Sequence, residues 1–279
     1  MSHDHSHHDS AAMAEMLDLD AEVLGSYLAD ATNWVHDLSV GVPVRRILDL
    51  GCGTGNGALA LAGRFPDAEV TAVDKSPEFL GRVKARAGDL GRADRVRVIE
   101  ADLDGPWPDL GSVDLTWTSL ALHHLADPDR GLAKLLAATS PGGLVAVAEM
   151  SSQVRFLPDD LGFGEPGLEA RVHAVLAQRR AAELPHLGAD WGERLAGAGF
   201  AVIADRTFEI DLISPLPESA GRLAQIFLGR LRSEFDDALS AEDLAALDVV
   251  LADDGPGSVR RRQDLEIRGT RTLWVGRRP

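Results

Sequence analysis

The stretch "ILDLGCGTG", Ile47 to Gly55, joins a short apolar run to a loop in which every second residue is glycine. Glycines at positions 51, 53 and 55, directly after a strand, let backbone N–H groups approach a ligand without a Cβ in the way. The helix expected after the loop directs its positive N-terminus at the same place. The stretch therefore predicts a strand, a ligand-binding loop and a helix, an arrangement that suits many nucleotides.

The acidic residue of this stretch, Asp49, bears on which ligand the loop holds. Residues 53–58 also satisfy the relaxed G-x-G-x-x-A pattern of dinucleotide-binding loops, although a lone match of this kind is weak. A carboxylate just before the loop would repel a pyrophosphate and would attract an ammonium or sulfonium group. The pattern therefore favours a positively charged ligand over a dinucleotide.

Two further acidic residues follow predicted strands. Asp74 comes after the second strand and can accept hydrogen bonds from both hydroxyls of a ribose. Asp102 comes after the third strand and can accept from the exocyclic amine of adenine. Carboxylates at strand ends also cap helices, but three of them at the carboxyl edge of one parallel sheet favour a binding site.

Outward from the loop, apolar strands alternate with amphipathic helices, which predicts an α/β fold with a doubly wound, Rossmann-like sheet. Short helices are expected after Gly55, from Ser76-Pro77 and from Asp127-Pro128, where the side chains before each proline can act as N-caps. Seven strands are expected, at 46–50, 69–73, 96–100, 112–117, 144–149, 200–212 and 265–279.

Composition narrows the class of protein. The chain has 279 residues, 45% hydrophobic and 26% charged, and no apolar run long enough to span a membrane, which predicts a globular cytoplasmic protein without a secretory signal. The net charge of -16 disfavours nucleic acid as a partner, because phosphate neutralisation supplies most of that affinity. The single cysteine excludes a disulfide and a thiolate metal cluster, and we expect no bound metal.

Five segments together resemble a known family. They are "ILDLGCGTG", "AVDKSPEFL", "VIEADL", "VDLTWTSLALHHLADP" and "SPGGLVAVAEM", between about residues 46 and 150. The chain resembles the class I S-adenosylmethionine-dependent methyltransferases, in particular the small-molecule branch of the ubiquinone/menaquinone-biosynthesis type. The resemblance implies a seven-stranded sheet whose last strand runs antiparallel, with the cofactor over the carboxyl ends of strands one to four.

The resemblance also implies cofactor-binding residues. The methionine part of S-adenosylmethionine would lie against the loop, the ribose against the end of the second strand, and the adenine against the end of the third. His123 and Thr118, after and at the end of the fourth strand, would close over the methionine end, and S-adenosylhomocysteine would be the product. Ser119 departs from the asparagine that relatives often have. The implied cofactor-binding set is Asp49, Gly51, Cys52, Gly53, Asp74, Lys75, Asp102, Leu103, Thr118 and His123.

The acceptor is expected to be a small molecule methylated on O, N or C. The segment 118–121 lacks the Asn/Asp-Pro-Pro-aromatic motif with which nucleic-acid branches grip a base, and a dedicated base is optional because alignment and water exclusion supply much of the acceleration. Candidate bases are His123, His124 and Glu149, followed by His173 and His186. Candidate acceptor-lining residues are Tyr27, Trp34, Trp117, Phe156, Phe163 and His173.

The order of the segments predicts a core with cover insertions, as a monomer or a homodimer. The expected parts are a disordered His-containing tail at 1–19, a helical cover at 20–40, the cofactor-binding core at 41–150, a cover insertion at 151–188, a core helix and strand six at 189–212, a helical cover at 213–264, and the last strand at 265–279. Two other functions stay open: an enzyme that uses the cofactor for a reaction other than methylation, and a cofactor-binding protein without enzyme activity.

Overall fold

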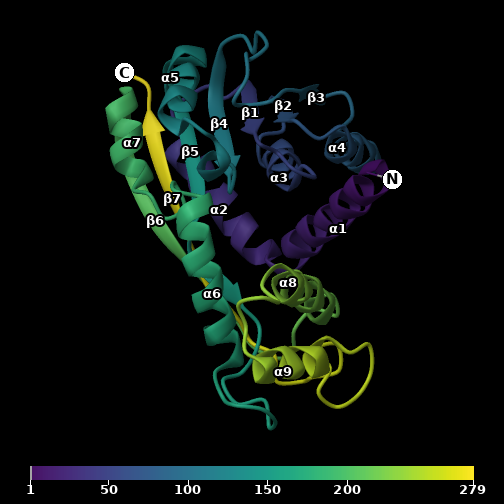
Figure 1. The fold of residues 1–279 in the computed structure, drawn as a ribbon. Coiled ribbons are helices and arrows are strands. Elements are labelled where there is room, and N and C mark those ends of the chain that lie inside the picture. The colour runs from purple at the N-terminus through teal and green to yellow at the C-terminus, as the bar shows by residue number, and fades with distance from the viewer. Residues whose placement is uncertain (1) are drawn as a thin grey trace. The chain divides into compact units, whose positions relative to one another are not determined.

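Seven strands form one sheet in the computed structural model, which describes residues 2–279 (Figure 1). The strand order is β3-β2-β1-β4-β5-β7-β6. The strands are β1 (Arg46–Leu50), β2 (Glu69–Asp74), β3 (Val96–Glu100), β4 (Val113–Ser119), β5 (Thr139–Arg155), β6 (Ala201–Leu212) and β7 (Ile267–Arg277). The prediction of an α/β, Rossmann-like sheet of seven strands is confirmed.

Strands β1 to β5 run parallel, and β7 runs antiparallel to β5. Register pairs such as Asp49↔Ala72 and Asp49↔Trp117 place the carboxyl ends of β1, β2 and β4 side by side. The direction of β7 follows from its contacts, because Gly142 N donates to Arg278 O near one end of β5, and Thr270 donates to Ser152 near the other. The loops that follow β1, β2 and β4 therefore lie next to one another at the carboxyl edge of the sheet, where ligands bind in open α/β sheets.

Helices and one 3-10 turn connect the strands. In chain order they are α1 (Ser2–Val23), α2 (Gly25–Leu38), α3 (Asn56–Arg64), α4 (Pro77–Asp89), η1 (Leu122–His124), α5 (Pro128–Ala138), α6 (Leu168–Glu183), α7 (Trp191–Ala198), α8 (Ala220–Glu234) and α9 (Ala241–Leu251). The expected caps are confirmed: Ser76 accepts from Phe79 N at the start of α4, and Asp127 accepts from Arg130 N at the start of α5. No helix among residues 2–279 has the length and apolar character that crossing a membrane requires.

Contacts between residues divide the chain into two compact units. Unit 1 comprises the chain up to Gly25, Ser152–Pro185 and Glu209–Thr270. Unit 2 comprises Ser26–Ser151, His186–Phe208 and Arg271–Pro279. The second and third segments of unit 1 overlap the ranges 151–188 and 213–264 that were expected to form the cover.

In unit 2, apolar side chains fill both faces of the parallel strands. Alternate residues of β1, such as Leu48 and Leu50, face a core that includes Trp191 and Leu195 of α7. The other face of these strands is covered by α3 and α4, whose buried residues include Ala58 and Val83. A sheet covered by helices on both faces needs almost continuous apolar strands, which explains the burial of the whole stretch 47–50.

In unit 1, the helices pack on one another. Helix α1 packs on α8, where Glu15 pairs with Arg222 at 2.8 Å, and α8 packs on α9. Phe156 and Phe227 lie 5.4 Å apart between ring centroids and contribute to the same apolar interior. Burial of these faces gives the unit a core of its own.

The structure corrects several predicted boundaries. Helix α1 spans Ser2–Val23, where a disordered tail over 1–19 was expected, because Ala14 and Val23 are buried and Glu15 pairs with Arg222. Strand β5 runs to Arg155, beyond the predicted end at Glu149, and helix α9 was not anticipated as a separate element. The expected cover at 20–40 is divided between the two units after Gly25.

Candidate active site

The glycine loop of unit 2 is fixed to the end of β2 by backbone hydrogen bonds. Gly51 N and Cys52 N both donate to Val73 O, each at 2.9 Å. Gly53 N donates to Asp74 Oδ2 at 2.9 Å, while Asp74 Oδ1 accepts from Ser76 N at the same distance. Asp74 therefore positions the loop, and it is not the N-cap of α4, which is Ser76.

Asp49 is the most unusual charged residue at this edge. Its side chain is 2% exposed, its Oδ2 has no hydrogen-bond partner among the described residues, and it receives a backbone hydrogen bond from Ala58. Burial raises the pKa of Asp49 to about 7, and the nearby carboxylate of Asp74 adds to this increase. A buried carboxylate with an unfilled oxygen is electrostatically suited to a cationic ligand.

The glycines leave room that side chains would fill. Gly51 has a φ of +72°, and a Cβ there would collide with Ala121 and contact Leu103. A Cβ on Gly57 would lie 2.7 Å from Trp117 Nε1 and 3.0 Å from Asp49 Oδ2. The first turn of α3 thus passes directly over the buried carboxylate, and the loop passes directly beside the segment after β4.

The segment after β4 turns sharply. Leu120 adopts a φ of +54°, which non-glycine residues rarely do, and its N–H donates to Ala148 O at 2.9 Å. The turn sends Ala121 to the glycine loop and starts the short helix η1 that carries His123. Sequence reasoning missed Leu120 and Ala121, and only the small size of Ala121 could have indicated a close approach.

A buried histidine–glutamate pair follows this turn. His123 Nδ1 lies 2.6 Å from Glu149 Oε2 on β5, and the two residues are 4% and 3% exposed. Glu149 Oε1 and the Thr118 hydroxyl, on the neighbouring strand β4, are buried without hydrogen-bond partners among the described residues. His124 stacks on His123 with 4.1 Å between ring centroids. The three candidate bases therefore lie together, and two of them, His123 and Glu149, form a hydrogen-bonded pair.

The remaining predicted cofactor residues differ in exposure. Asp102 is exposed and accepts from Asp104 N at 3.0 Å, and Lys75 is also exposed. Leu103 is half-buried near Gly51, and its contact with an adenine stays a prediction. Cys52 is buried, and burial together with Asp49 and Asp74 raises the pKa of its thiol, so it stays protonated and unreactive.

The predicted acceptor-lining residues are distributed over both units. In unit 2, Tyr27 and Trp34 pack edge-on against Phe208, and Trp117 is fully buried beneath the first turn of α3. Trp117 thus packs in the core at the base of the loop. In unit 1, Phe156 is buried, Phe163 is half-buried near Gly257, and His173 lines a polar cavity. His186, the other histidine considered as a base, lies 3.1 Å from Arg194 in unit 2.

Comparison with known proteins finds a family match over the segment that carries this edge. Residues 47–143 match the family described as methyltransferase domain. The malonyl-[acyl-carrier protein] O-methyltransferase of Halorhodospira halophila is 35% identical over 184 residues, which are 63% of this chain and 56% of the relative. The demethylmenaquinone methyltransferase of Thermus thermophilus is 38% identical over 114 residues, covering 40% of this chain and 50% of that one.

A third relative, the trans-aconitate 2-methyltransferase of Variovorax paradoxus, is 31% identical over 135 residues, or 47% of this chain and 50% of its own. The chain thus spans about half the length of these curated relatives. Among solved structures, the YcgJ protein of Bacillus subtilis aligns over 89% of this chain and 98% of its own, with a TM-score of 0.52 and 17% identity. That likeness concerns the fold.

Proposed function

We propose, on the premise that residues 47–143 are a methyltransferase domain of the class I type, that the protein transfers the methyl group of S-adenosylmethionine to a small metabolite. S-adenosylhomocysteine would be the second product. By their names, the relatives above methylate malonyl-[acyl-carrier protein], demethylmenaquinone and trans-aconitate, which supports the class of reaction and leaves the acceptor open.

The observation that carries the proposal is the buried Asp49 with its unfilled Oδ2. S-adenosylmethionine carries an ammonium and a sulfonium group, and a desolvated carboxylate attracts such charges more strongly than an exposed one. A pyrophosphate at the same place would meet a like charge. The donor set therefore fits S-adenosylmethionine and disfavours a dinucleotide.

The rest of the edge supports the same ligand. Both oxygens of Asp74 accept one backbone N–H each and keep lone pairs for the hydroxyls of a ribose. Asp102 is exposed at the end of the next strand, with Leu103 beside the loop, where an adenine can lie on an apolar side chain. These residues would bind and orient the donor, whose sulfonium supplies the methyl group when it is bound.

His123 and Glu149 would handle the proton of the acceptor. A hydrogen bond from His123 Nδ1 to Glu149 leaves Nε2 unprotonated in the neutral ring, so Nε2 can accept a proton from an acceptor hydroxyl, amine or acidic carbon. Glu149 stabilises the imidazolium that this transfer produces. Exclusion of water around the buried pair would keep the acceptor aligned for in-line displacement.

Calorimetry with S-adenosylmethionine tests the binding step. We expect the wild type to bind S-adenosylmethionine and Asp49→Asn to bind it about 10- to 150-fold more weakly. This factor corresponds to the loss of one interaction with a charged group, roughly 1.5–3 kcal/mol. Glu169→Gln, a change at another buried carboxylate in unit 1, is the matched control and should leave affinity unchanged. Failure of the wild type to bind at millimolar ligand would overturn the proposal.

Product analysis tests the reaction. Incubation with S-adenosylmethionine and a panel of phenols, amines and carboxylic acids should release S-adenosylhomocysteine together with a methylated acceptor. Consumption of an acceptor without S-adenosylhomocysteine would instead indicate that the cofactor serves another reaction. Tight binding without any turnover across the panel would indicate a cofactor-binding protein.

A further inference from the structure

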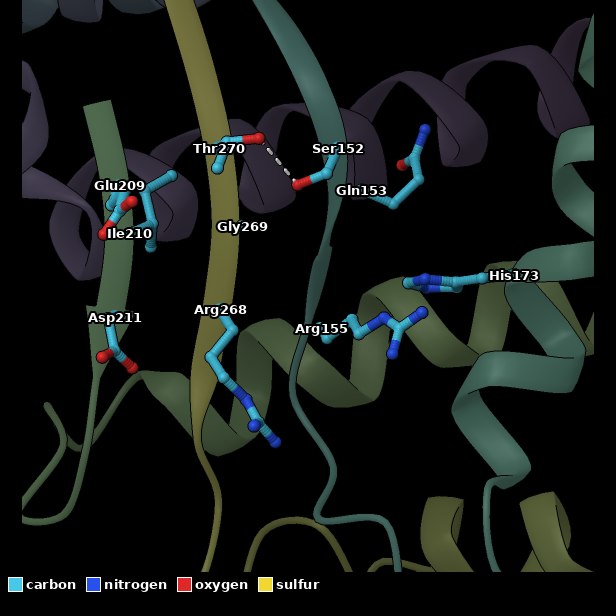
Figure 2. Close-up of a pocket in the computed structure, with 10 residues that line it drawn as sticks. All are labelled: Ser152, Gln153, Arg155, His173, Glu209, Ile210, Asp211, Arg268, Gly269 and Thr270. Atoms are coloured by element: carbon cyan, nitrogen blue, oxygen red, sulfur yellow. Dashed lines mark hydrogen bonds between the residues drawn. The ribbon is translucent and has the colours of Figure 1, made fainter. Parts of the chain in front are cut away.

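Unit 1 contains a cavity of about 510 Å³ lined mostly by polar residues, among them His173, which was considered above as an acceptor-lining residue (Figure 2). Its walls come from β5, α6, β6 and β7. The lining residues are Ser152, Gln153, Arg155, His173, Glu209, Ile210, Asp211, Arg268, Gly269 and Thr270. All of them belong to unit 1, so the cavity is defined within that unit alone.

Two arginines give one side of the cavity its charge. Arg268 is paired, with its Nη2 2.7 Å from Glu266 Oε2. Arg155, at the end of β5, makes no hydrogen bond or ion pair with any residue that the structure describes. Its positive charge acts instead on His173 and Glu169, and Figure 2 shows its side chain directed toward His173. The guanidinium is therefore available to a ligand.

His173 supplies a second unfilled group. The side chain is 7% exposed, and its Nε2 has no hydrogen-bond partner among the described residues although the residue lines the cavity. Burial, Arg155 and Arg180 lower the pKa of His173 to about 4, so the ring is neutral near pH 7 and can donate one hydrogen bond. A buried ring nitrogen without a hydrogen-bond partner is costly in either tautomer, and in the Nε2–H tautomer a ligand carboxylate can supply the acceptor.

The nearest glutamate, Glu169, does not form a hydrogen bond with His173 Nε2. Glu169 Oε1 lies 3.9 Å from His173 Nε2, which is too long for a hydrogen bond. Both oxygens of Glu169 already accept from the backbone, with Phe156 N at 2.9 and 3.0 Å and Leu157 N at 2.8 Å. Glu169 is thus committed to fixing the chain after β5.

The opposite side of the cavity is acidic. Glu209 and Asp211 lie on β6, across β7 from Arg155, as Figure 2 shows, and both are exposed. Between the two sides, Thr270 donates to Ser152 Oγ at 2.9 Å, a pair of hydroxyls that can also contact a ligand. The cavity is therefore positive at one end, negative at the other and polar between them.

We propose that this cavity is a binding site for a small organic acid, with the carboxylate held between Arg155 and His173 and a hydrogen-bond donor of the same molecule, such as an ammonium or hydroxyl group, directed at Glu209 and Asp211. The planar guanidinium matches a carboxylate, and the two acids disfavour a multiply charged anion such as phosphate. The proposal concerns unit 1 alone and does not rest on the proposed methyl transfer.

The charge of the whole chain argues for local recognition. At a net charge of -16, the protein repels small anions at long range. The affinity of this cavity for an anion must therefore come from the groups that line it, Arg155 and His173. A solvated surface arginine would account for Arg155 alone. It does not account for His173, whose buried Nε2 lacks a hydrogen-bond partner among the described residues.

Three matched probes test the proposal on the full chain: 5-aminovalerate, which has both groups, valerate, which has the carboxylate, and pentylamine, which has the amine. We expect calorimetry at tens of millimolar ligand to give affinities in that order. NMR titration of protein with isotope-labelled histidine should show that valerate raises the pKa of His173. The reason is that a nearby anion favours the charged ring and offsets the positive charge of Arg155.

Arg155→Gln should weaken valerate binding at least tenfold and abolish the shift of the His173 resonances. Arg179→Gln is the matched control, because Arg179 lies on the same helix as His173, pairs with Asp237 and does not line the cavity. Equal binding in the two variants, binding of pentylamine as tight as that of valerate, preference for inorganic phosphate, or unchanged His173 resonances at saturating valerate would each overturn the proposal.

Discussion

Two buried histidine–glutamate pairs, one in each unit, have opposite internal geometry. In unit 2, His123 and Glu149 share a 2.6 Å hydrogen bond, and the other oxygen of Glu149 has no partner among the described residues. In unit 1, His173 and Glu169 are 3.9 Å apart, because both oxygens of Glu169 are bound to backbone N–H groups. What the glutamate's oxygens contact therefore decides what the histidine can do.

The difference separates proton transfer from ligand binding. A carboxylate directed at an imidazole fixes its tautomer and makes the far nitrogen a base. A carboxylate already bound to backbone N–H groups leaves the imidazole without this hydrogen bond, and burial together with Arg155 and Arg180 lowers the pKa of His173 to about 4. Under the two proposals, the same two residue types would give a proton acceptor in one unit and a hydrogen-bond donor for a ligand in the other.

The largest expected effect is on the unit 2 pair. His123→Ala should lower the methyl-transfer rate by about 10²- to 10⁴-fold, the usual contribution of a general base. Glu149→Gln should lower the rate and change its pH profile, since Glu149 acts through His123, and Glu149→Asp should restore part of it. Steady-state kinetics against pH checks this. A rate unaffected by His123→Ala would remove the base from the mechanism.

The next effect concerns the buried carboxylate beneath the loop. The pKa of Asp49 is about 7 in the folded chain and 3.8 ordinarily. As pH rises, the carboxyl group therefore loses its proton in the unfolded chain first, and the free energy of unfolding falls between these two pH values. The loss amounts to about 4 kcal/mol, and Asp49→Asn should remove it. Urea unfolding at pH 5 and pH 8 should therefore show the variant gaining on the wild type at the higher pH. A constant difference would contradict this.

A smaller effect of opposite sign is expected at His173. Its pKa is about 4 in the fold and 6.5 ordinarily, so the unfolded chain binds the proton first as pH falls, and stability is lost between these values. The loss is about 3 kcal/mol. In urea unfolding at pH values between about 4.5 and 6.5, the free energy of unfolding of His173→Gln should depend less on pH than that of the wild type. An unchanged slope would mean that His173 ionises normally.

The smallest effect provides a baseline for the buried pairs. Glu15 and Arg222 form a half-exposed ion pair between α1 and α8, at 42% side-chain exposure each. Glu15→Gln should cost less than about 1 kcal/mol, and less still in high salt. Unfolding at two salt concentrations measures it. A cost as large as that of the buried groups would show that α1 contributes more to unit 1 than this contact accounts for.

The local elements at the carboxyl edge were predictable, because their signals are local. The glycine spacing and the apolar run of 47–50 place the loop, and Ser76 and Asp127 mark helix starts through their own hydroxyl and carboxylate. The end of β5 and the helix α1 were predicted wrongly. Their limits depend on contacts with residues far along the chain, such as Thr270 and Arg222.

Side-chain pairing was the least predictable part. His123 and Glu149 were each named as candidate bases, but nothing in the sequence joins residues on either side of α5. The collision that forces Gly51 to lack a Cβ comes from Ala121, which follows a backbone turn at Leu120 that no residue preference indicates. Such contacts depend on the register of β1, β4 and β5, which only the folded sheet defines.

The position of β7 in the sheet has a consequence for synthesis. Strand β6 lies at the edge, and the neighbour that separates it from β5 is β7, which is made later. While the ribosome adds α8, α9 and the residues up to Ile267, β6 has no strand to pair with, and its residues Val202 and Ile203, still 39% exposed in the finished fold, are open to other chains. We therefore expect β6 to be unpaired, and open to pairing with other chains, until β7 is made.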